Sequence, residues 1–279
     1  MVPLHTWLPD TAEQATPGTS VLLIGVLDKI GTYGMIVMCV PLLTSDMHWV
    51  SLTMMSLAIV AIIYGGLAAI VQDHLYRLIS YTSVSHFGFM VLGIFGGSIA
   101  GASGAMVYMV AHGLSIAGLY LISGFLVRRT GTARLSEMGG IARVSPVIAG
   151  TFLFSALASI ALPGLSGFVP EWLVLTGTFS VSTAAGLFAL LGVVIAALYA
   201  LWPYQKVFTG APKEKYVGIG DLNKSEKLLV TPLLIAMLAL GLFTAPLTNL
   251  LAKQAELISA YTGQPEQVSV VLSQGGEAK

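Results

Sequence analysis

Five ionisable side chains lie within long hydrophobic stretches of this sequence: Asp28, Lys29, His86, His112 and Glu171. Placing an ionisable group at bilayer depth costs at least about 2.5 to 3.5 kcal/mol on insertion scales, so each is a functional candidate. Amines, imidazoles and carboxylates all take up and release protons. A row of such groups across a membrane predicts a path for protons or small cations.

Lys29 lies about eleven residues into an apolar stretch, which places it roughly 16 Å deep at the rise of an α-helix. Asp28 precedes it, but neighbouring residues on a helix point about 100° apart and do not face each other. We therefore expect each to face a different helix. The alternatives for Lys29 are a structural ion pair, or snorkelling to the interface, which the depth disfavours.

His86 and His112 occur in SYTSVSHFGF and YMVAHGLSIAG, on successive antiparallel helices. Counted from the helix ends on one side of the membrane, they lie roughly 12 and 22 Å deep. Hydroxyl side chains that could hold water flank them: Thr82, Ser83, Ser85, Tyr108 and Ser115. The alternatives are hydrogen-bonded packing residues, or a metal site that would lack a clear third ligand.

Glu171 follows a helix break in ALPGLSGFVPEWLV, where Pro163, Gly164 and Gly167 interrupt the helix. Broken backbone at membrane depth is tolerated only where it is buried in protein or lines a wet cavity. Pro170 suits the first turn of the next half-helix, whose positive dipole end favours an anion. The alternative is a capping acid at the lipid interface.

The composition identifies an integral membrane protein. Of 279 residues, 56% are hydrophobic and 9% are charged, whereas soluble domains are about 25% charged. The net charge of zero and the absence of basic motifs argue against nucleic-acid binding. Cys39 is the only cysteine, so one chain cannot form a disulfide. Motifs for chemistry on a small-molecule substrate are absent from the sequence.

Hydropathy predicts an all-α protein of about seven transmembrane helices in one domain. The fifth stretch is too long for one straight crossing and contains the break, so we expect two half-helices there. A surface helix at 250–261 and a polar tail follow. The seven stretches are 18–44, 50–71, 78–97, 104–127, 145–180, 185–208 and 228–248.

The basic residues predict the orientation in the membrane. One side receives ten of them, and the other receives only Lys253 and Lys279. The positive-inside rule makes the first side cytoplasmic, so the N-terminal loop is cytoplasmic and the C-terminus lies outside. The ten are Arg77, Arg128, Arg129, Arg134, Arg143, Lys206, Lys213, Lys215, Lys224 and Lys227.

Five motifs in order resemble one family, over about residues 1 to 248. They are PLHTWLPDTAEQATPGTSVLL, VLDKIGTYGM, RLISYTSVSHFGF, MVAHGLSIAGLYLISG and ALPGLSGFVPEWLV. They closely resemble the antiporter-like proton-channel subunits of proton-pumping NADH:quinone oxidoreductase, respiratory complex I, and most of all its chain M, or subunit 4. In that family two inverted five-helix repeats each contain a broken helix, and buried Lys, His and Glu residues form a hydrated axis along the midplane.

The resemblance implies a role for four residues as a proton relay, in which the proton moves from Lys29 through His86 and His112 to Glu171 and out. Lys29 matches the family's bridging lysine, His86 and His112 match its central histidines, and Glu171 matches the acid of the second broken helix, the expected exit. Chains of the L type resemble one another in carrying lysine at that last position, so glutamate favours chain M. Asp28 is not carried over.

The family has fourteen helices, and this chain resembles the C-terminal half without the glutamate–lysine pair of the first repeat. We therefore expect a truncated gene model or a fragment that does not pump alone. The expected organisation is the end of a preceding broken helix and a cytoplasmic loop at 1–17, a transmembrane proton-channel domain at 18–248, and an amphipathic segment with a polar tail at 249–279.

The resemblance implies a non-redox subunit of a translocase in the cell inner (plasma) membrane. It implies no cofactor in this chain, with flavin, iron–sulfur clusters and quinone in partner subunits. The main alternative is the D-type subunit of a multisubunit Na⁺/H⁺ antiporter, and membrane-bound hydrogenases use similar chains. A structural or assembly subunit with vestigial charges is a third hypothesis.

Overall fold

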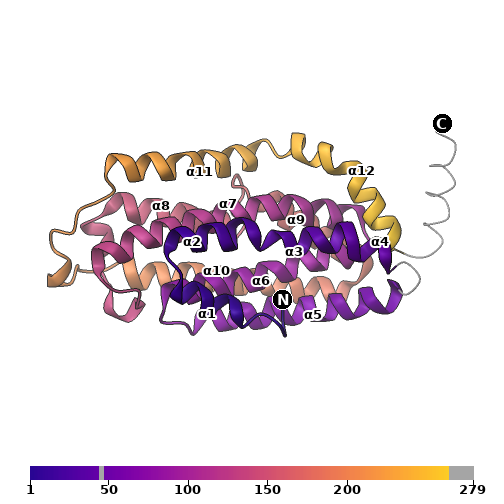
Figure 1. The fold of residues 1–279 in the computed structure, drawn as a ribbon, viewed down its shortest axis with the longest axis horizontal. Helices are drawn as coiled ribbons and strands as arrows, with labels where there is room; N and C mark the ends of the chain where they lie inside the picture. Colours follow the sequence, from indigo (N-terminus) through magenta and orange to yellow (C-terminus); the bar gives the residue numbers. More distant parts are fainter. Residues whose placement is uncertain (44–46, 264–279) are drawn as a thin grey trace.

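The computed structural model describes residues 1–43 and 47–263, which form a helical bundle (Figure 1). Six helices are long and apolar enough to cross a membrane. The first of these spans, Pro17–Leu42, is made of consecutive segments: α2 (Pro17–Leu22), π-helical η1 (Leu23–Leu27), α3 (Lys29–Gly34), π-helical η2 (Met35–Cys39) and α4 (Val40–Leu42). The other five are α5 (Met47–Ile70), α6 (Leu75–Phe95), α7 (Ile99–Thr130), α10 (Thr183–Phe208) and α11 (Lys224–Leu242).

Two shorter apolar helices, α8 (Pro146–Ser159) and α9 (Phe168–Val181), occupy the stretch where a broken helix was predicted. With the six spans they confirm the expected fold of about seven crossings that include one broken helix. Among the described residues, two further α-helices lie outside this set, α1 (Trp7–Gln14) and α12 (Ala245–Thr262), together with the short 3-10 helices η4 (Leu135–Glu137), η5 (Ile141–Arg143) and η6 (Glu214–Tyr216). The predicted surface helix at 250–261 falls within α12.

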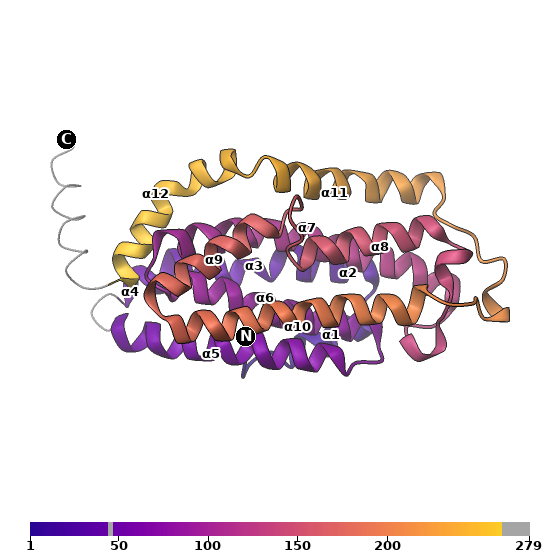
Figure 2. The same ribbon diagram turned by 180° about the vertical axis from the view of Figure 1, so that it is seen from behind.

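Helix α6 forms the centre of the bundle. All of its residues except Arg77 are buried, and it packs against α5, α7, α9 and α10. Figures 1 and 2 show it from opposite sides, enclosed by its neighbours. A helix that is buried all round needs no polar face toward water. The polar side chains of α6 therefore contact protein, which spares them the cost of facing lipid.

Glycines bring α5 and α6 close together near His86. A methyl group added to Gly88 would lie 2.6 Å from the carbonyl oxygen of Ala58. One added to Gly65 would lie 2.7 Å from the backbone nitrogen of Ser85. Small residues allow this close approach of helices in membranes. It lets the Ser85 hydroxyl donate a hydrogen bond of 2.9 Å to the carbonyl of Ile62 on α5.

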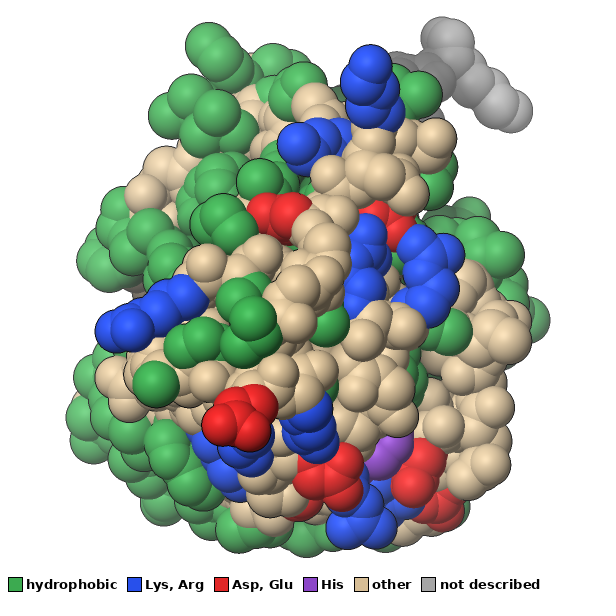
Figure 3. Space-filling model, turned by 90° about the vertical axis from the view of Figure 1, so that its left-hand side faces the viewer, with side chains coloured by type: hydrophobic (Ala, Val, Ile, Leu, Met, Phe, Trp, Pro, Cys, Tyr) green, Lys and Arg blue, Asp and Glu red, His purple; other side chains and the backbone are tan. Residues whose placement is uncertain are grey.

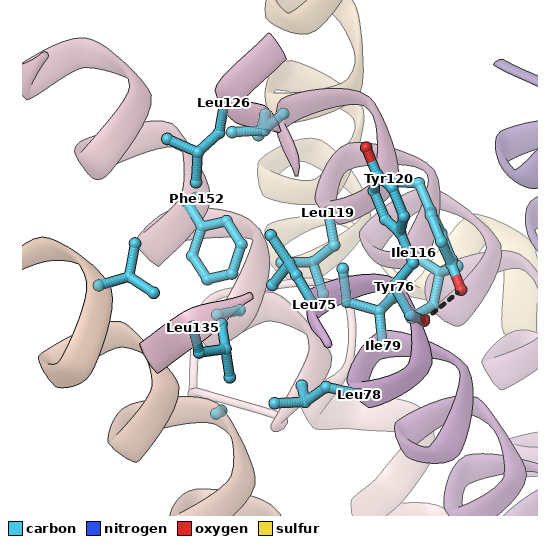
Figure 4. Close-up of a cluster of buried hydrophobic side chains, with 14 of the residues drawn as sticks. Leu75, Tyr76, Leu78, Ile79, Ile116, Leu119, Tyr120, Leu126, Leu135 and Phe152 are labelled. Atoms are coloured by element: carbon cyan, nitrogen blue, oxygen red, sulfur yellow. Dashed lines mark hydrogen bonds between the residues drawn. The ribbon is translucent and has the colours of Figure 1, made fainter. Parts of the chain in front are cut away.

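Helix α7 extends beyond the start of α6 at one end of the bundle. Its 32 residues correspond to about 48 Å, well over the ~30 Å of the hydrocarbon core. The relative level of α6 and α7 is fixed where Tyr120 stacks on Tyr76 and donates a hydrogen bond of 3.1 Å to the Tyr76 carbonyl (Figure 4). Tyr76 is the second residue of α6, so the last ten residues of α7 project past the start of α6.

Charged side chains gather at that projecting end (Figure 3). Arg128 and Arg129 in the last turn of α7 pair with Glu226 in the first turn of α11. Arg77 of α6 pairs with Asp10 and Glu13 of α1. These ion pairs link the ends of neighbouring helices at the face predicted to be basic. Lys206 at the end of α10 forms a further ion pair there, since its ammonium lies 3.1 Å from a carboxylate oxygen of Asp73.

Candidate functional site

The break between α8 and α9 is formed by the glycine and proline residues that predicted it. Helix α8 ends at Ser159 and α9 begins at Phe168. Between them Gly164 has a φ of 89°, which glycine adopts without steric cost, and Ala161 has a φ of 58°. Pro163 cannot donate a backbone hydrogen bond, so it does not extend α8. The break therefore exposes one helix C-terminus and one helix N-terminus inside the bundle.

The two helix ends of the break face groups of opposite charge type. The carbonyl of Ser159, at the C-terminus of α8, lies 2.9 Å from Nε2 of His86. Glu171 lies in the first turn of α9, where unpaired amides concentrate. The C-terminal end of a helix dipole favours a cation, and the N-terminal end favours an anion. The break thus favours a protonated histidine on one side and a carboxylate on the other.

His86 has partners suited to both of its protonation states. Its Nδ1 lies 2.7 Å from the carbonyl of Thr82, and its Nε2 faces the carbonyl of Ser159. Carbonyl oxygens only accept, so both bonds form together only in the doubly protonated ring. The hydroxyl of Tyr199 also lies 3.2 Å from Nε2 and can donate to it when the ring is neutral. The surroundings of His86 therefore accommodate gain and loss of a proton.

His112 lies beside His86, with ring centroids 4.6 Å apart. The predicted difference of roughly 10 Å in depth is wrong. The prediction took the ends of α6 and α7 to lie at the same depth, but α7 projects beyond the start of α6 on that side. Measured from the stacked pair Tyr76 and Tyr120, His86 is ten residues along α6 and His112 is eight residues along α7. In the described part of the chain, neither ring nitrogen of the buried His112 has a hydrogen-bond partner.

Lys29 faces the protein interior, with 7% of its surface exposed. Its ammonium donates a hydrogen bond of 2.5 Å to the carbonyl of Ile24 in the π-helical turn η1. It also lies 5.2 Å from the ring centre of Phe87, which contacts His112 edge-on. Snorkelling to the interface is not observed. As predicted, no salt bridge joins Asp28 to Lys29 within residues 1–43 and 47–263.

Glu171 is 3% exposed, which is inconsistent with a capping acid at the lipid interface. Its Oε2 accepts a hydrogen bond of 2.6 Å from the hydroxyl of Tyr108 on α7. Its Oε1 is buried and has no partner among the described residues. Tyr108 is one helical turn from His112, and its ring lies edge-on to both histidines. Four of the five ionisable residues singled out in the sequence thus lie around one buried region.

Sequence reasoning missed Tyr199 altogether and noted Tyr108 only as a flanking hydroxyl. Tyr199 lies in an apolar stretch of α10, where nothing distinguishes it from an aromatic packing residue. The carbonyl of Ser159 was also missed, because a backbone partner leaves no signature in side-chain types. The only available signal was the predicted break, which implies free helix ends.

Comparison with known proteins decides the family. The family described as "NADH:quinone oxidoreductase/Mrp antiporter, TM" matches residues 1–197. The chain belongs to this family. It is 43% identical over 262 residues to NADH-quinone oxidoreductase subunit M of Mycobacterium tuberculosis. The aligned residues cover 94% of this chain and 47% of that protein. It is 38% identical to subunit M of Rhodobacter capsulatus, over 94% of this chain and 51% of that one.

Solved structures agree with this assignment to the oxidoreductase and antiporter family. A chain of respiratory complex I from Thermus thermophilus with bound NADH superposes with a TM-score of 0.88 at 31% identity, over 94% of this chain and 56% of that chain. A chain of the Mrp complex from Dietzia has the same fold, with a TM-score of 0.79 at 20% identity, over 96% of this chain and 57% of that one. The chain spans about half the length of the curated relatives it matches.

Proposed function

We propose that this chain is a proton-translocating membrane part of an NADH:quinone oxidoreductase, with Lys29, His112, His86 and Glu171 as its relay. The observation that carries the proposal is the joint burial of these groups around the helix break, contributed by α3, α7, α6 and α9. Relatives named NADH-quinone oxidoreductase subunit M support it. A redox step in other subunits would change the charge near Lys29 and drive the proton onward.

The contacts lead us to exchange the two histidines in the order expected from the sequence. Lys29 and His112 both contact Phe87, so we take His112 as the first imidazole to receive the proton. The adjacent rings of His112 and His86 share it next. Each charge moved against 100 mV costs about 2.3 kcal/mol. Charging one group must therefore displace the proton on the next, because an open wire would dissipate the gradient.

Water is required at two points of this path. Both nitrogens of His112 and the Oε1 of Glu171 are buried without a partner in the part of the chain that the structure describes. Buried polar atoms of this kind normally bind ordered water, which makes about three hydrogen bonds. We therefore place bridging waters between Lys29 and His112 and beside Glu171.

The orientation follows from the charged end of the bundle. Ion pairs of Arg77, Arg128 and Lys206 lie at the end that we assign to the cytoplasm of a bacterial plasma membrane. In this orientation Glu171 is the group that releases the proton toward the outside. The partners are other membrane subunits, which hold the flavin, iron–sulfur clusters and quinone, and this chain contributes no cofactor of its own.

A subunit of a Na⁺/H⁺ antiporter would use the same fold, which the Mrp complex shares. The named relatives favour the oxidoreductase, since those at 43% and 38% identity are subunit M proteins. A purely structural subunit would need no buried ionisable groups, and these carry an energetic cost at bilayer depth.

The test is Glu171→Gln in the complex that contains this subunit, reconstituted into proteoliposomes. Glutamine keeps the shape of the side chain and one oxygen acceptor, but its amide does not take up and release a proton. We therefore expect proton translocation through this subunit to be lost while the complex still assembles. The matched control is Glu256→Gln on α12, an exposed glutamate that should leave proton stoichiometry unchanged. An unchanged number of protons per electron pair in Glu171→Gln would contradict the proposed function.

A further inference from the structure

The relay has a gap between His86 and Glu171. Within residues 1–43 and 47–263, no hydrogen bond joins the two side chains, although each bonds to a different tyrosine. The Tyr199 hydroxyl lies 3.2 Å from Nε2 of His86. The Tyr108 hydroxyl donates to Oε2 of Glu171 at 2.6 Å. The two phenols therefore contact opposite ends of the gap.

Both tyrosines are buried against the same imidazole. Tyr108 of α7 and Tyr199 of α10 are each 1% exposed. Their rings lie edge-on to the ring of His86, with centroids 5.8 Å and 6.1 Å away. Two different helices, α7 and α10, thus direct phenols toward the central histidine.

A phenol suits this position because its hydroxyl both donates and accepts a hydrogen bond while it stays neutral. A neutral group avoids the cost that another buried charge would bring. We propose that the hydroxyls of Tyr199 and Tyr108 carry the proton from His86 to Glu171, an inference that rests on the relay proposed above. Tyr199 receives the proton at the histidine, and Tyr108 delivers it to the carboxylate.

The transfer balances without a charged tyrosine. As Tyr108 gives its hydroxyl proton to the Glu171 carboxylate, its oxygen takes the hydroxyl proton of Tyr199, directly or over a single water. The Tyr199 oxygen takes the Nε2 proton of His86. Each hydroxyl loses one O–H bond and gains another. His86 ends neutral, in the state that accepts from Tyr199, and rotation of the hydroxyls restores the starting arrangement.

The carbonyl of Ser159 competes with Tyr199 for the Nε2 proton of His86. A protonated His86 donates Nε2–H to this carbonyl, 2.9 Å away, or to the Tyr199 oxygen, 3.2 Å away. The carbonyl cannot pass a proton on, because it has no proton to release. The proton therefore moves toward Glu171 only when Nε2–H points to the Tyr199 oxygen and not to the Ser159 carbonyl.

The experiment compares Tyr108→Phe, Tyr199→Phe and the double variant with a matched control, Tyr216→Phe. All three tyrosines are buried and bear a hydrogen-bonded hydroxyl, and Tyr216 lies in the loop between α10 and α11, away from the relay. Each change keeps the ring and removes one oxygen. The complex that contains this subunit is purified, checked for assembly on native gels and reconstituted into proteoliposomes. The readouts are the proton-translocation rate through this subunit and its solvent deuterium isotope effect.

We expect Tyr108→Phe and Tyr199→Phe each to slow translocation by about 100-fold, the lower end of what positioned proton transfer contributes. The double variant should be no slower than the slower single variant, because both lie on one path. Tyr216→Phe should stay at the rate of the unsubstituted subunit. The slowed variants should also show a changed isotope effect, which lost packing alone would not produce.

Two results would overturn the inference and leave the relay intact. One is normal translocation in the tyrosine variants while Glu171→Gln is inactive, which would mean that protons reach Glu171 through water alone. The other is an equal loss in Tyr216→Phe, which would mean that any missing buried hydroxyl disturbs the subunit. Normal translocation in Glu171→Gln itself would instead overturn the proposed function, and this inference with it.

Discussion

His86 and Lys29 differ in how their surroundings treat a bound proton. His86 faces two carbonyl oxygens and one hydroxyl, so its partners suit both the neutral and the charged ring. The ammonium of Lys29 instead donates to a single backbone carbonyl and lies over an aromatic ring, so a buried charge there has few partners. A change of charge nearby would therefore suffice to release the proton from Lys29, whereas the partners of His86 suit the ring before and after transfer.

Replacing Lys29 separates a proton carrier from a fixed positive charge. Arginine keeps the charge but is not deprotonated in proteins. We expect Lys29→Arg to abolish proton translocation as fully as Lys29→Met, with both complexes assembled. Proteoliposomes that contain the reconstituted complex would measure it. Retained translocation in Lys29→Arg would show that Lys29 supplies only a charge.

At the scale of elements, close packing of α5 on α6 holds the central helix in place. Gly88, two residues after His86, allows the backbones to touch, and its neighbour on α5 is a carbonyl oxygen that has no side-chain freedom to move. The break between α8 and α9 contributes in a different way, since it supplies a carbonyl end and an amide end to the same region. The positions of the relay residues thus depend on where α5 and α6 approach each other and on where α8 ends and α9 begins.

Gly88→Ala should destabilise the subunit, because a methyl group would lie 2.6 Å from the carbonyl oxygen of Ala58. We expect a loss of about 1 to 3 kcal/mol, the usual cost of overpacking. Gly150→Ala on α8 is the matched control. A methyl group there meets nothing within 4 Å, and alanine favours a helix by about 0.5 to 1 kcal/mol.

Thermal unfolding of the detergent-solubilised complex would compare the two glycine variants. A lowered midpoint in Gly88→Ala and an unchanged or raised midpoint in Gly150→Ala would support close packing. Equal midpoints in both would show that α5 and α6 do not approach as closely as described.

At the scale of the whole molecule, hydropathy predicted most of the fold, because a membrane span must be long and apolar wherever it lies. The break was predictable since proline and positive-φ glycines interrupt helices in any context. The depth of His112 was not, because it depends on how far α7 slides past α6, which the Tyr120–Tyr76 contact sets. The role of Tyr199 was also hidden, since it arises only when α10 packs beside His86.

A proton can pass without interruption from Lys29 to Glu171 only if ordered water completes the path between the side chains. A density map of the assembled complex, at a resolution that shows ordered water, tests this requirement. We expect waters within hydrogen-bonding distance of His112 and of Glu171 Oε1, joining Lys29, the two histidines and Glu171 into one connected path. A dry gap between Lys29 and His112, or these side chains facing acyl chains, would contradict it.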